Sequence, residues 1–303
     1  MMKNLKSISL LTIIFTTVFF SAFVSAGEKR IEKSFSDKDR IRVKLVLGSC
    51  TIVKSGDNKI HVRLVYTYND ESFEPRFRER GHSLYIQEKF RGNNPEGSSN
   101  WTIEIPDGIS VDVGSATGNL SFKNIDCRLR CNTGTGDIEV SNSRGELRLE
   151  TGTGMIEVVD SRGEFELSSG TGTITIENSS GNFDASCGTG DIDVSKISIS
   201  DESNFSSGIG DVYVRMPEGD DYELSISSGT GKAVLDFNGG DVVGYFELKA
   251  DVGLGRIVLP FNFDKEEELN EGRNRYVIKS FTRKKDTPKF FISTGTGKAE
   301  LKR

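Results

Sequence analysis

The sequence contains very few of the residues that most often perform catalysis or hold a metal ion. It has two histidines, His61 and His82, four cysteines and one tryptophan in 303 residues. Nucleophilic, acid–base and metal-assisted chemistry relies largely on such side chains held together in one place. Neither a nucleophile–base pair nor a cluster of metal ligands can be named. We therefore predict no catalytic residue, no metal and no cofactor, and a protein that is not an enzyme.

The chain also lacks a stretch of clustered basic residues. Lys and Arg number 39 against 45 Asp and Glu, which gives a formal net charge of −6. Nucleic-acid binding requires a basic patch that neutralises phosphates. We therefore expect no nucleic-acid partner, and a surface whose net negative charge favours solubility.

The N-terminal segment, residues 1–26, has the pattern of a secretory signal peptide. Lys3 and Lys6 precede an uncharged run from Ile8 to Ala26, which ends in small residues where a signal peptidase would cut. A single membrane anchor is the alternative, because an uncharged run of this length nearly spans a bilayer. We expect residues 1–26 to be removed, leaving an exported protein that is not an integral membrane protein. Its location would be the periplasm, the outer surface or the extracellular space.

Proline is scarce, with 6 residues against 33 glycines, and the glycines recur at a fixed interval. Units such as GTGDIEV and GTGMIEV repeat with a period of about 18 residues, which places evenly spaced glycines at Gly118, Gly136, Gly154, Gly172 and Gly190. Apolar residues stand two and four positions after each glycine with a polar residue between them, which is typical of a half-buried strand. The interval then lengthens, with glycines at Gly210, Gly231 and Gly255, and the last gap, from Gly255 to Gly297, equals two coils.

Each 18-residue unit holds a second alternating segment, and a turn rich in Asn, Asp and Gly lies between the two. One pair of strands cannot bury its apolar face alone, so the units must stack on one another. We predict an all-β fold, a parallel β-solenoid of the right-handed β-helix type, with coils of about 18–21 residues that lie about 4.8 Å apart.

The repeats also divide the chain. After the signal peptide, residues 27–100 are expected to form a less regular N-terminal β region that caps the solenoid. Residues 101–303 are expected to form the regular solenoid itself. The run DKEEELNEGRNRY interrupts the repeat, so we expect a charged insertion near residues 264–285 that forms a loop or a hairpin.

The repeated glycines allow three interpretations. A phosphate loop is disfavoured because a strand, not a helix, follows each GTG. A toxin-type calcium roll needs an Asp two residues after the last glycine, where this chain has Ile138, Ile156, Ile174 and Ile192. We interpret the glycines as corners at which the neighbouring coil leaves no room for a Cβ atom, with the threonines stacked along the axis.

The most basic short stretch is Arg76 to Arg80, with aromatic residues nearby, and it suggests binding of an acidic glycan or another envelope component. The alternative is a solvated strand whose glutamates balance the charge. Acidic residues on outward positions of the repeats are a second candidate, although surface ion pairs also explain them. The candidate ligand-contacting surface comprises Arg76, Arg78, Arg80, Asp137, Glu139, Glu157, Asp191 and Asp193.

Four cysteines in an exported chain allow disulfides, but the coil spacing disfavours them. Cys127 and Cys131 are about 13 Å apart along one strand, and Cys187 is about three coils away, beyond the reach of a disulfide. Cys131 falls on an apolar ladder and is interpreted as a core residue. The pairing state of Cys50 stays open.

The signal peptide, the Pro-x-Gly turn before a strand and the recurring SGTGDIxV units resemble the bacterial "putative adhesin" β-solenoid families of unknown function. The resemblance covers roughly residues 40–303 and implies the fold, but it transfers no catalytic residues. The expected function is that of an adhesin-like binding or structural protein of the cell envelope, with a glycan or another envelope protein as partner. A carbohydrate-active β-helix enzyme, lyase or hydrolase, and an envelope-stress or assembly factor are the alternatives.

Overall fold

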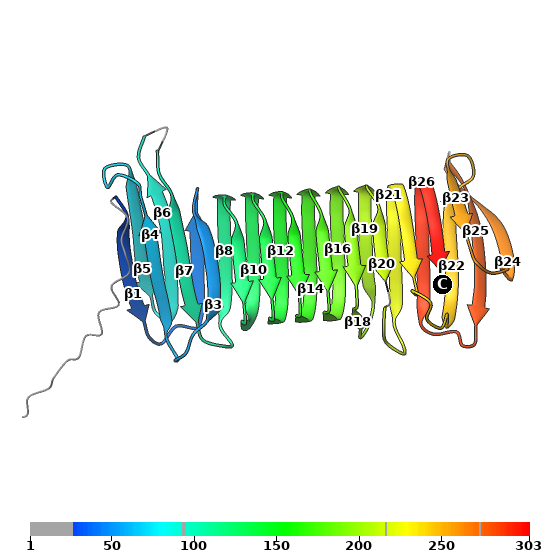
Figure 1. Cartoon of the computed structure of the whole chain (residues 1–303), viewed down its shortest axis with the longest axis horizontal. Helices are drawn as coiled ribbons and strands as arrows, with labels where there is room; N and C mark the ends of the chain where they lie inside the picture. Colours follow the sequence, from blue (N-terminus) through cyan, green and yellow to red (C-terminus); the bar gives the residue numbers. More distant parts are fainter. Residues whose placement is uncertain (1–26, 93–94, 216, 273) are drawn as a thin grey trace, which may run out of the picture.

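The computed structural model describes residues 27–92, 95–215, 217–272 and 274–303, so the expected signal peptide lies outside the described residues. Within them the secondary structure consists of 26 strands, most of them stacked in parallel along one long axis (Figure 1). No described segment is a helix long and apolar enough to cross a membrane. The predicted all-β parallel solenoid is confirmed.

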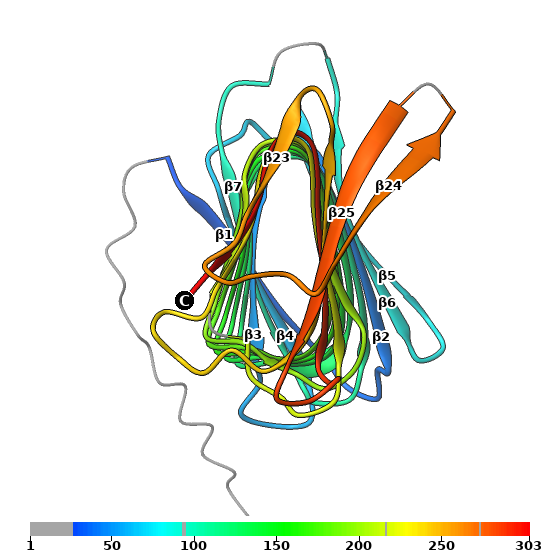
Figure 2. The ribbon, with the colours of Figure 1, turned by 90° about the vertical axis from the view of Figure 1, so that its right-hand side faces the viewer.

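Each central coil contributes one long strand to one wall and one short strand to the other. The long-strand wall contains β8 (Ser110–Thr117), β10 (Asp126–Thr135), β12 (Arg144–Thr153), β14 (Arg162–Thr171), β16 (Ser180–Thr189) and β19 (Ser203–Ile209), with β18 (Ser198–Ile199) beside β16. The short-strand wall contains β9 (Leu120–Lys123), β11 (Ile138–Ser141), β13 (Ile156–Val159), β15 (Ile174–Glu177), β17 (Ile192–Ser195) and β20 (Val212–Arg215). Neighbouring coils pair in parallel and in register, so Ile138 stands opposite Ile156. Figure 2 shows the two walls end-on.

The corner glycines occupy a backbone conformation that other residues rarely adopt. Gly154 has φ of 153°, and a Cβ atom there would lie 2.1 Å from the carbonyl oxygen of Gly136 in the preceding coil. The corner interpretation is therefore confirmed: stacking leaves no space for a side chain. The threonines one residue earlier, such as Thr135 and Thr153, form an exposed column along the axis.

A second column of small polar residues lies inside the corner and donates hydrogen bonds along the stack. The hydroxyl of Thr151 donates to the carbonyl oxygen of Gly136 at 2.9 Å, and Ser169 donates to Gly154 at 3.1 Å. Cys187 occupies the same column, and its thiol lies 3.0 Å from the carbonyl oxygen of Gly172. Because buried polar groups cost free energy unless they are paired, this column satisfies carbonyls that the corner would otherwise leave unbonded.

At the N-terminal end the coils do not stack in chain order. β2 (Arg40–Leu45) pairs in parallel with both β6 (Ser83–Phe90) and β8, and β3 (Ser49–Lys54) pairs with both β7 (Ser99–Ile105) and β9. The first coil of the chain is thus inserted between two coils that follow it in the sequence (Figure 1).

The C-terminal end has the same kind of insertion. The last strand, β26 (Lys289–Lys302), lies between β21 (Glu223–Asp236) and the coil made by β22 (Gly244–Asp251) and β23 (Gly255–Val258). Gly297 stacks directly on Gly231 and also on Gly255. The interpretation of the gap from Gly255 to Gly297 as two successive coils is therefore wrong, because the chain leaves the stack after β23 and returns one level closer to the centre.

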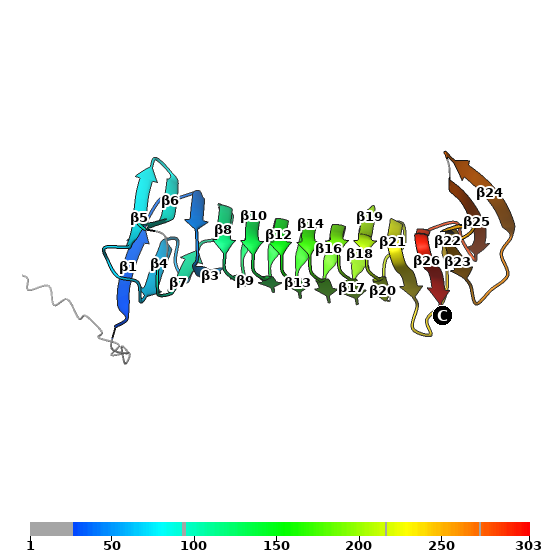
Figure 3. The same ribbon diagram turned by 90° about the horizontal axis from the view of Figure 1, so that it is seen from above.

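Antiparallel strands close both ends of the stack. β1 (Lys29–Phe35) pairs with β4 (Ile60–Tyr66), and β5 (Phe73–Arg80) pairs with β6. At the other end, β24 (Lys265–Glu271) and β25 (Asn274–Arg283) form a hairpin that pairs with β22. Figure 3 shows both sets of strands at the ends of the axis.

A lysine ammonium lies over a phenylalanine ring near each end of the solenoid. The ammonium of Lys33 lies 4.8 Å from the Phe77 ring, which also stacks on Phe35 at 6.3 Å. The ammonium of Lys279 lies 4.2 Å from the Phe263 ring. At the N-terminal end Lys33 thus places a charged group over a ring that packs against the core, as a capping repeat with a polar outer face requires.

Candidate functional site

A basic groove lies on the long-strand wall near the N-terminal end. β6 pairs with β5 on one side and with β2 on the other, so Arg78, Tyr85 and Arg42 form one row across three strands. The next row contains Arg76, Gln87 and Lys44. Alternation along each strand turns these side chains to the outer face. Together with Arg80 they line a groove of about 300 Å³.

The positive charge of the groove is only partly neutralised. Arg42 lies 3.2 Å from Asp112, and Arg76 lies 2.8 Å from Glu74. The hydrogen bond from Arg76 holds the pKa of the Glu74 carboxyl below its usual value. Within the described residues, Lys44, Arg78 and Arg80 have no ion-pair partner. Three cationic groups are therefore available to an anionic ligand.

An aromatic ring lies among these cations. The guanidinium groups of Arg42 and Arg80 lie 5.8 Å and 6.0 Å from the centroid of the Tyr85 ring. Guanidinium groups bind carboxylates and phosphates through two parallel N–H groups, and an aromatic face offers apolar contact. The arrangement suits a ligand that combines negative charge with a ring.

The structure brings the three predicted arginines together with two cations that were not among the predicted residues. Arg76, Arg78 and Arg80 point to one face of β5, while Arg42 and Lys44 come from β2, which precedes β5 by several strands in the chain. The alternation of RIRVK at residues 40–44 already placed these basic side chains on one face. These side chains lie beside those of β5 only because β2 is inserted next to β6.

The predicted acidic residues lie elsewhere. Glu139, Glu157 and Asp193 form a row on the short-strand wall, opposite the groove, and Asp193 is paired with Arg215 at 3.2 Å. Asp137 and Asp191 each accept a hydrogen bond from a backbone N–H of the next coil, at 2.8 Å. These two carboxylates join coils, and none of the five converges with the arginines.

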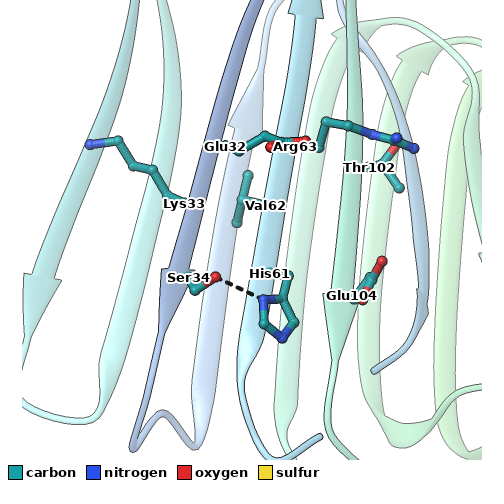
Figure 4. Close-up of a pocket in the computed structure, with 8 residues that line it drawn as sticks. All are labelled: Glu32, Lys33, Ser34, His61, Val62, Arg63, Thr102 and Glu104. Carbon is teal, nitrogen blue, oxygen red and sulfur yellow. Dashed lines mark hydrogen bonds between the residues drawn. The ribbon is translucent and has the colours of Figure 1, made fainter. Parts of the chain in front are cut away.

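A second depression, of about 440 Å³, lies on the short-strand wall at the same end (Figure 4). Here Ser34 Oγ lies 2.8 Å from His61 Nδ1, and His61 Nε2 lies 2.8 Å from Asp57 Oδ1. The sequence did not suggest this trio, because the antiparallel pairing of β1 with β4 brings Ser34 beside His61.

The trio differs from the triad of a serine hydrolase. There the serine bonds Nε2 and the carboxylate is buried, which lets it support the imidazolium. Here the serine is on Nδ1, and the Asp57 side chain is 50% exposed. The hydrogen bond with His61 lowers the pKa of the Asp57 carboxyl. We interpret the trio as a polar link between β1, β4 and the turn that precedes β4.

Comparison with known proteins identifies the family to which the chain belongs. The sequence profile described as Toastrack DUF4097 matches residues 36–240, more than half of the chain. The chain belongs to the Toastrack DUF4097 family. The predicted resemblance of the repeats to an adhesin-like β-solenoid family is thereby confirmed. No curated protein sequence matches this Toastrack protein.

Several solved structures are similar to this Toastrack protein. One is described as a "putative lipid binding protein" from Parabacteroides distasonis, with 14% identity, 92% of this chain and 97% of that chain covered, and a TM-score of 0.48. Another is a "putative adhesin" from the same species, with 14% identity, coverage of 91% and 96%, and a TM-score of 0.42. A "putative cell adhesion protein" from Clostridium sporogenes has 14% identity, coverage of 91% and 99%, and a TM-score of 0.26. Similarity at this level carries no conclusion about function.

Proposed function

We propose that this Toastrack protein is an exported, non-enzymatic binding protein of the cell envelope that holds an anionic glycan in its basic groove. The observation that carries the proposal is the convergence of five cationic side chains from β2 and β5 around Tyr85. A glycan of uronic acids or one bearing phosphate offers the carboxylates or phosphates that arginine binds in pairs, and sugar rings that pack on tyrosine.

The solenoid suits such a role. Its in-register ladders make a rigid rod, and a groove built on strands is held in one shape before the ligand arrives. Preorganisation of this kind lets a small groove bind without a large entropic cost. Binding of a charged polymer should weaken as salt screens the arginines.

Retention on immobilised polysaccharides tests the proposal. The mature chain should be retained on a polyuronate column and not on a neutral glucan, and no reducing ends or unsaturated uronides should appear. Replacement of Arg42, Arg78 and Arg80 by alanine should abolish retention. A matched variant with Arg144, Arg148 and Arg162 replaced removes the same charge from the central coils and should keep it.

Two other results would contradict the proposal. Equal retention of the groove variant and the matched variant would show that the groove is not the glycan site. Release of sugar products would instead support the carbohydrate-active enzyme.

A further inference from the structure

The two ends of the long-strand wall each finish in a strand that is paired on one side only. Among the described strands, β5 pairs only with β6, and β24 pairs only with β25. Both lie at the ends of the axis (Figures 1 and 3). A free strand edge offers its backbone N–H and C=O groups to another strand, so each end is a potential pairing surface.

The two edges carry opposite charge. β24 reads KEEELNE, with four glutamates and one lysine, and all seven residues are exposed. β5 carries three arginines and two glutamates, and its arginines are exposed. Charged edge strands ordinarily prevent pairing with like strands. Two copies of the same end of this protein therefore repel each other, because their charges are alike. Contact between the acidic end of one copy and the basic end of another is favoured, because those charges are opposite.

The strand directions also agree. β25 is antiparallel to β22, and β24 is antiparallel to β25, so β24 runs in the same direction as the strands of the wall. At the other end, β5 is antiparallel to β6 and so runs in the opposite direction to the wall. If two copies stand in line with their walls aligned, β24 of one therefore meets β5 of the other in antiparallel pairing. One such register places Arg76 opposite Glu271 and Arg80 opposite Glu267, all on the outer face.

The inner side of this contact carries charges of both signs. Glu266 and Glu268 point to the core side of β24, and at the other end Lys33 covers Phe77 from the core side. In the same register Glu268 stands opposite Glu79, whose charge Lys38 already balances at 2.8 Å. On the inner side Lys33 therefore supplies a cation near the acidic strand, while Lys38 and Glu79 neutralise each other.

We propose that this protein associates head to tail with a second copy of itself, with the acidic edge of β24 pairing along the basic edge of β5. Because the two surfaces differ and lie at opposite ends, the contact repeats and builds a linear chain of molecules along the solenoid axis. This goes beyond glycan binding, with which it competes for Arg76 and Arg80. The contact is small and charged, so it is weak and depends on salt.

Sedimentation velocity of the mature chain tests the proposal. The weight-average sedimentation coefficient should rise with protein concentration at low ionic strength, and the rise should vanish in about 1 M salt, where the Debye length is about 3 Å. Two variants are decisive: Glu267→Lys with Glu271→Lys on β24, and Arg76→Glu with Arg80→Glu on β5. Each alone should associate at least about 10-fold more weakly than the wild type.

Mixing and recombining these variants separates the proposal from a general charge effect. In the equimolar mixture the unchanged β24 edge of one variant meets the unchanged β5 edge of the other, and the two altered edges are complementary to each other as well, so the mixture should recover linear association. A chain carrying all four substitutions should recover linear association. The control Glu139→Lys with Glu157→Lys changes the same charge on a central row and should associate at least as strongly as the wild type.

Two outcomes would overturn head-to-tail association: a wild type that stays monomeric at every concentration, or a β24 variant that associates as the wild type does. Neither outcome touches glycan binding, because the β24 variant keeps the whole groove and should still be retained on the polyuronate column.

Discussion

The indole Nε1–H of Trp101 donates a hydrogen bond to the carboxylate of Glu88 at 2.8 Å inside the N-terminal end of the core. Glu88 is 2% exposed and also accepts from the Ser99 hydroxyl and from the backbone N–H groups of residues 46–48. Five donors from two parts of the chain therefore surround one carboxylate. This cluster bonds the corner of the inserted coil to β6 and β7.

Removal of this carboxylate should destabilise the N-terminal end. Glu88→Ala leaves five donors without their acceptor, three of them in buried hydrogen bonds, and should lower the free energy of unfolding by about 3 kcal/mol or more. Glu88→Gln keeps one acceptor oxygen and should cost less. Urea unfolding followed by fluorescence of Trp101, the single tryptophan, measures both. A Glu88→Ala midpoint equal to that of the wild type would contradict this role.

A side chain at a central corner should be far more costly than one at an open glycine. Gly154→Ala places a Cβ atom 2.1 Å from a backbone oxygen at φ of 153°, and should destabilise the protein by about 3 kcal/mol or more. Gly56→Ala is the matched control, since a Cβ atom there has no neighbour within 4 Å. Thermal unfolding monitored by circular dichroism should show a large loss for the first and almost none for the second.

Cys187 should be replaceable by serine without loss. Its neighbours in the inner column are Ser169 and Ser207, whose hydroxyls donate to corner carbonyls at 3.1 Å and 2.7 Å. A hydroxyl is a better donor than a thiol, so Cys187→Ser should raise the free energy of unfolding by about 0.5–1 kcal/mol, while Cys187→Ala should lower it. Urea midpoints of the three proteins check the order, and a serine variant less stable than the alanine variant would contradict it.

Stability should fall at alkaline pH through the buried thiols. All four cysteines are free and buried, and burial raises the pKa of the Cys127 thiol from 9.0 to about 12. The unfolded chain releases the Cys127 thiol proton above pH 9.0, whereas the folded protein keeps it until about pH 12. The contribution of this thiol to the free energy of unfolding is therefore fully present below pH 9.0 and is lost as the pH rises from 9.0 towards 12. Cys127→Ala should therefore show a shallower decline than the wild type over that interval. Parallel declines in denaturant titrations would argue that Cys127 does not contribute.

The repeat could be read from the sequence because it is set by contacts between adjacent coils. Corner glycines, the Ile138 to Ile192 ladder and the burial of Cys131 all follow from one repeating phase, and the structure agrees with each. Three members of the basic groove, Arg76, Arg78 and Arg80, were identified because they lie in the most basic short stretch of the sequence. Their alternation along one short strand is local information.

The order of coils at the two ends could not be read in this way. Every coil presents a similar apolar ladder, so the pattern alone does not specify which coil stacks on which. Only the tertiary structure inserts β2 between β6 and β8, and β26 between β21 and β22. That insertion brings Arg42 beside Tyr85. The solenoid follows from the sequence alone because its apolar ladders are periodic. The two ends and the groove depend on contacts between segments far apart in the chain, and a repeating pattern carries no information about such contacts.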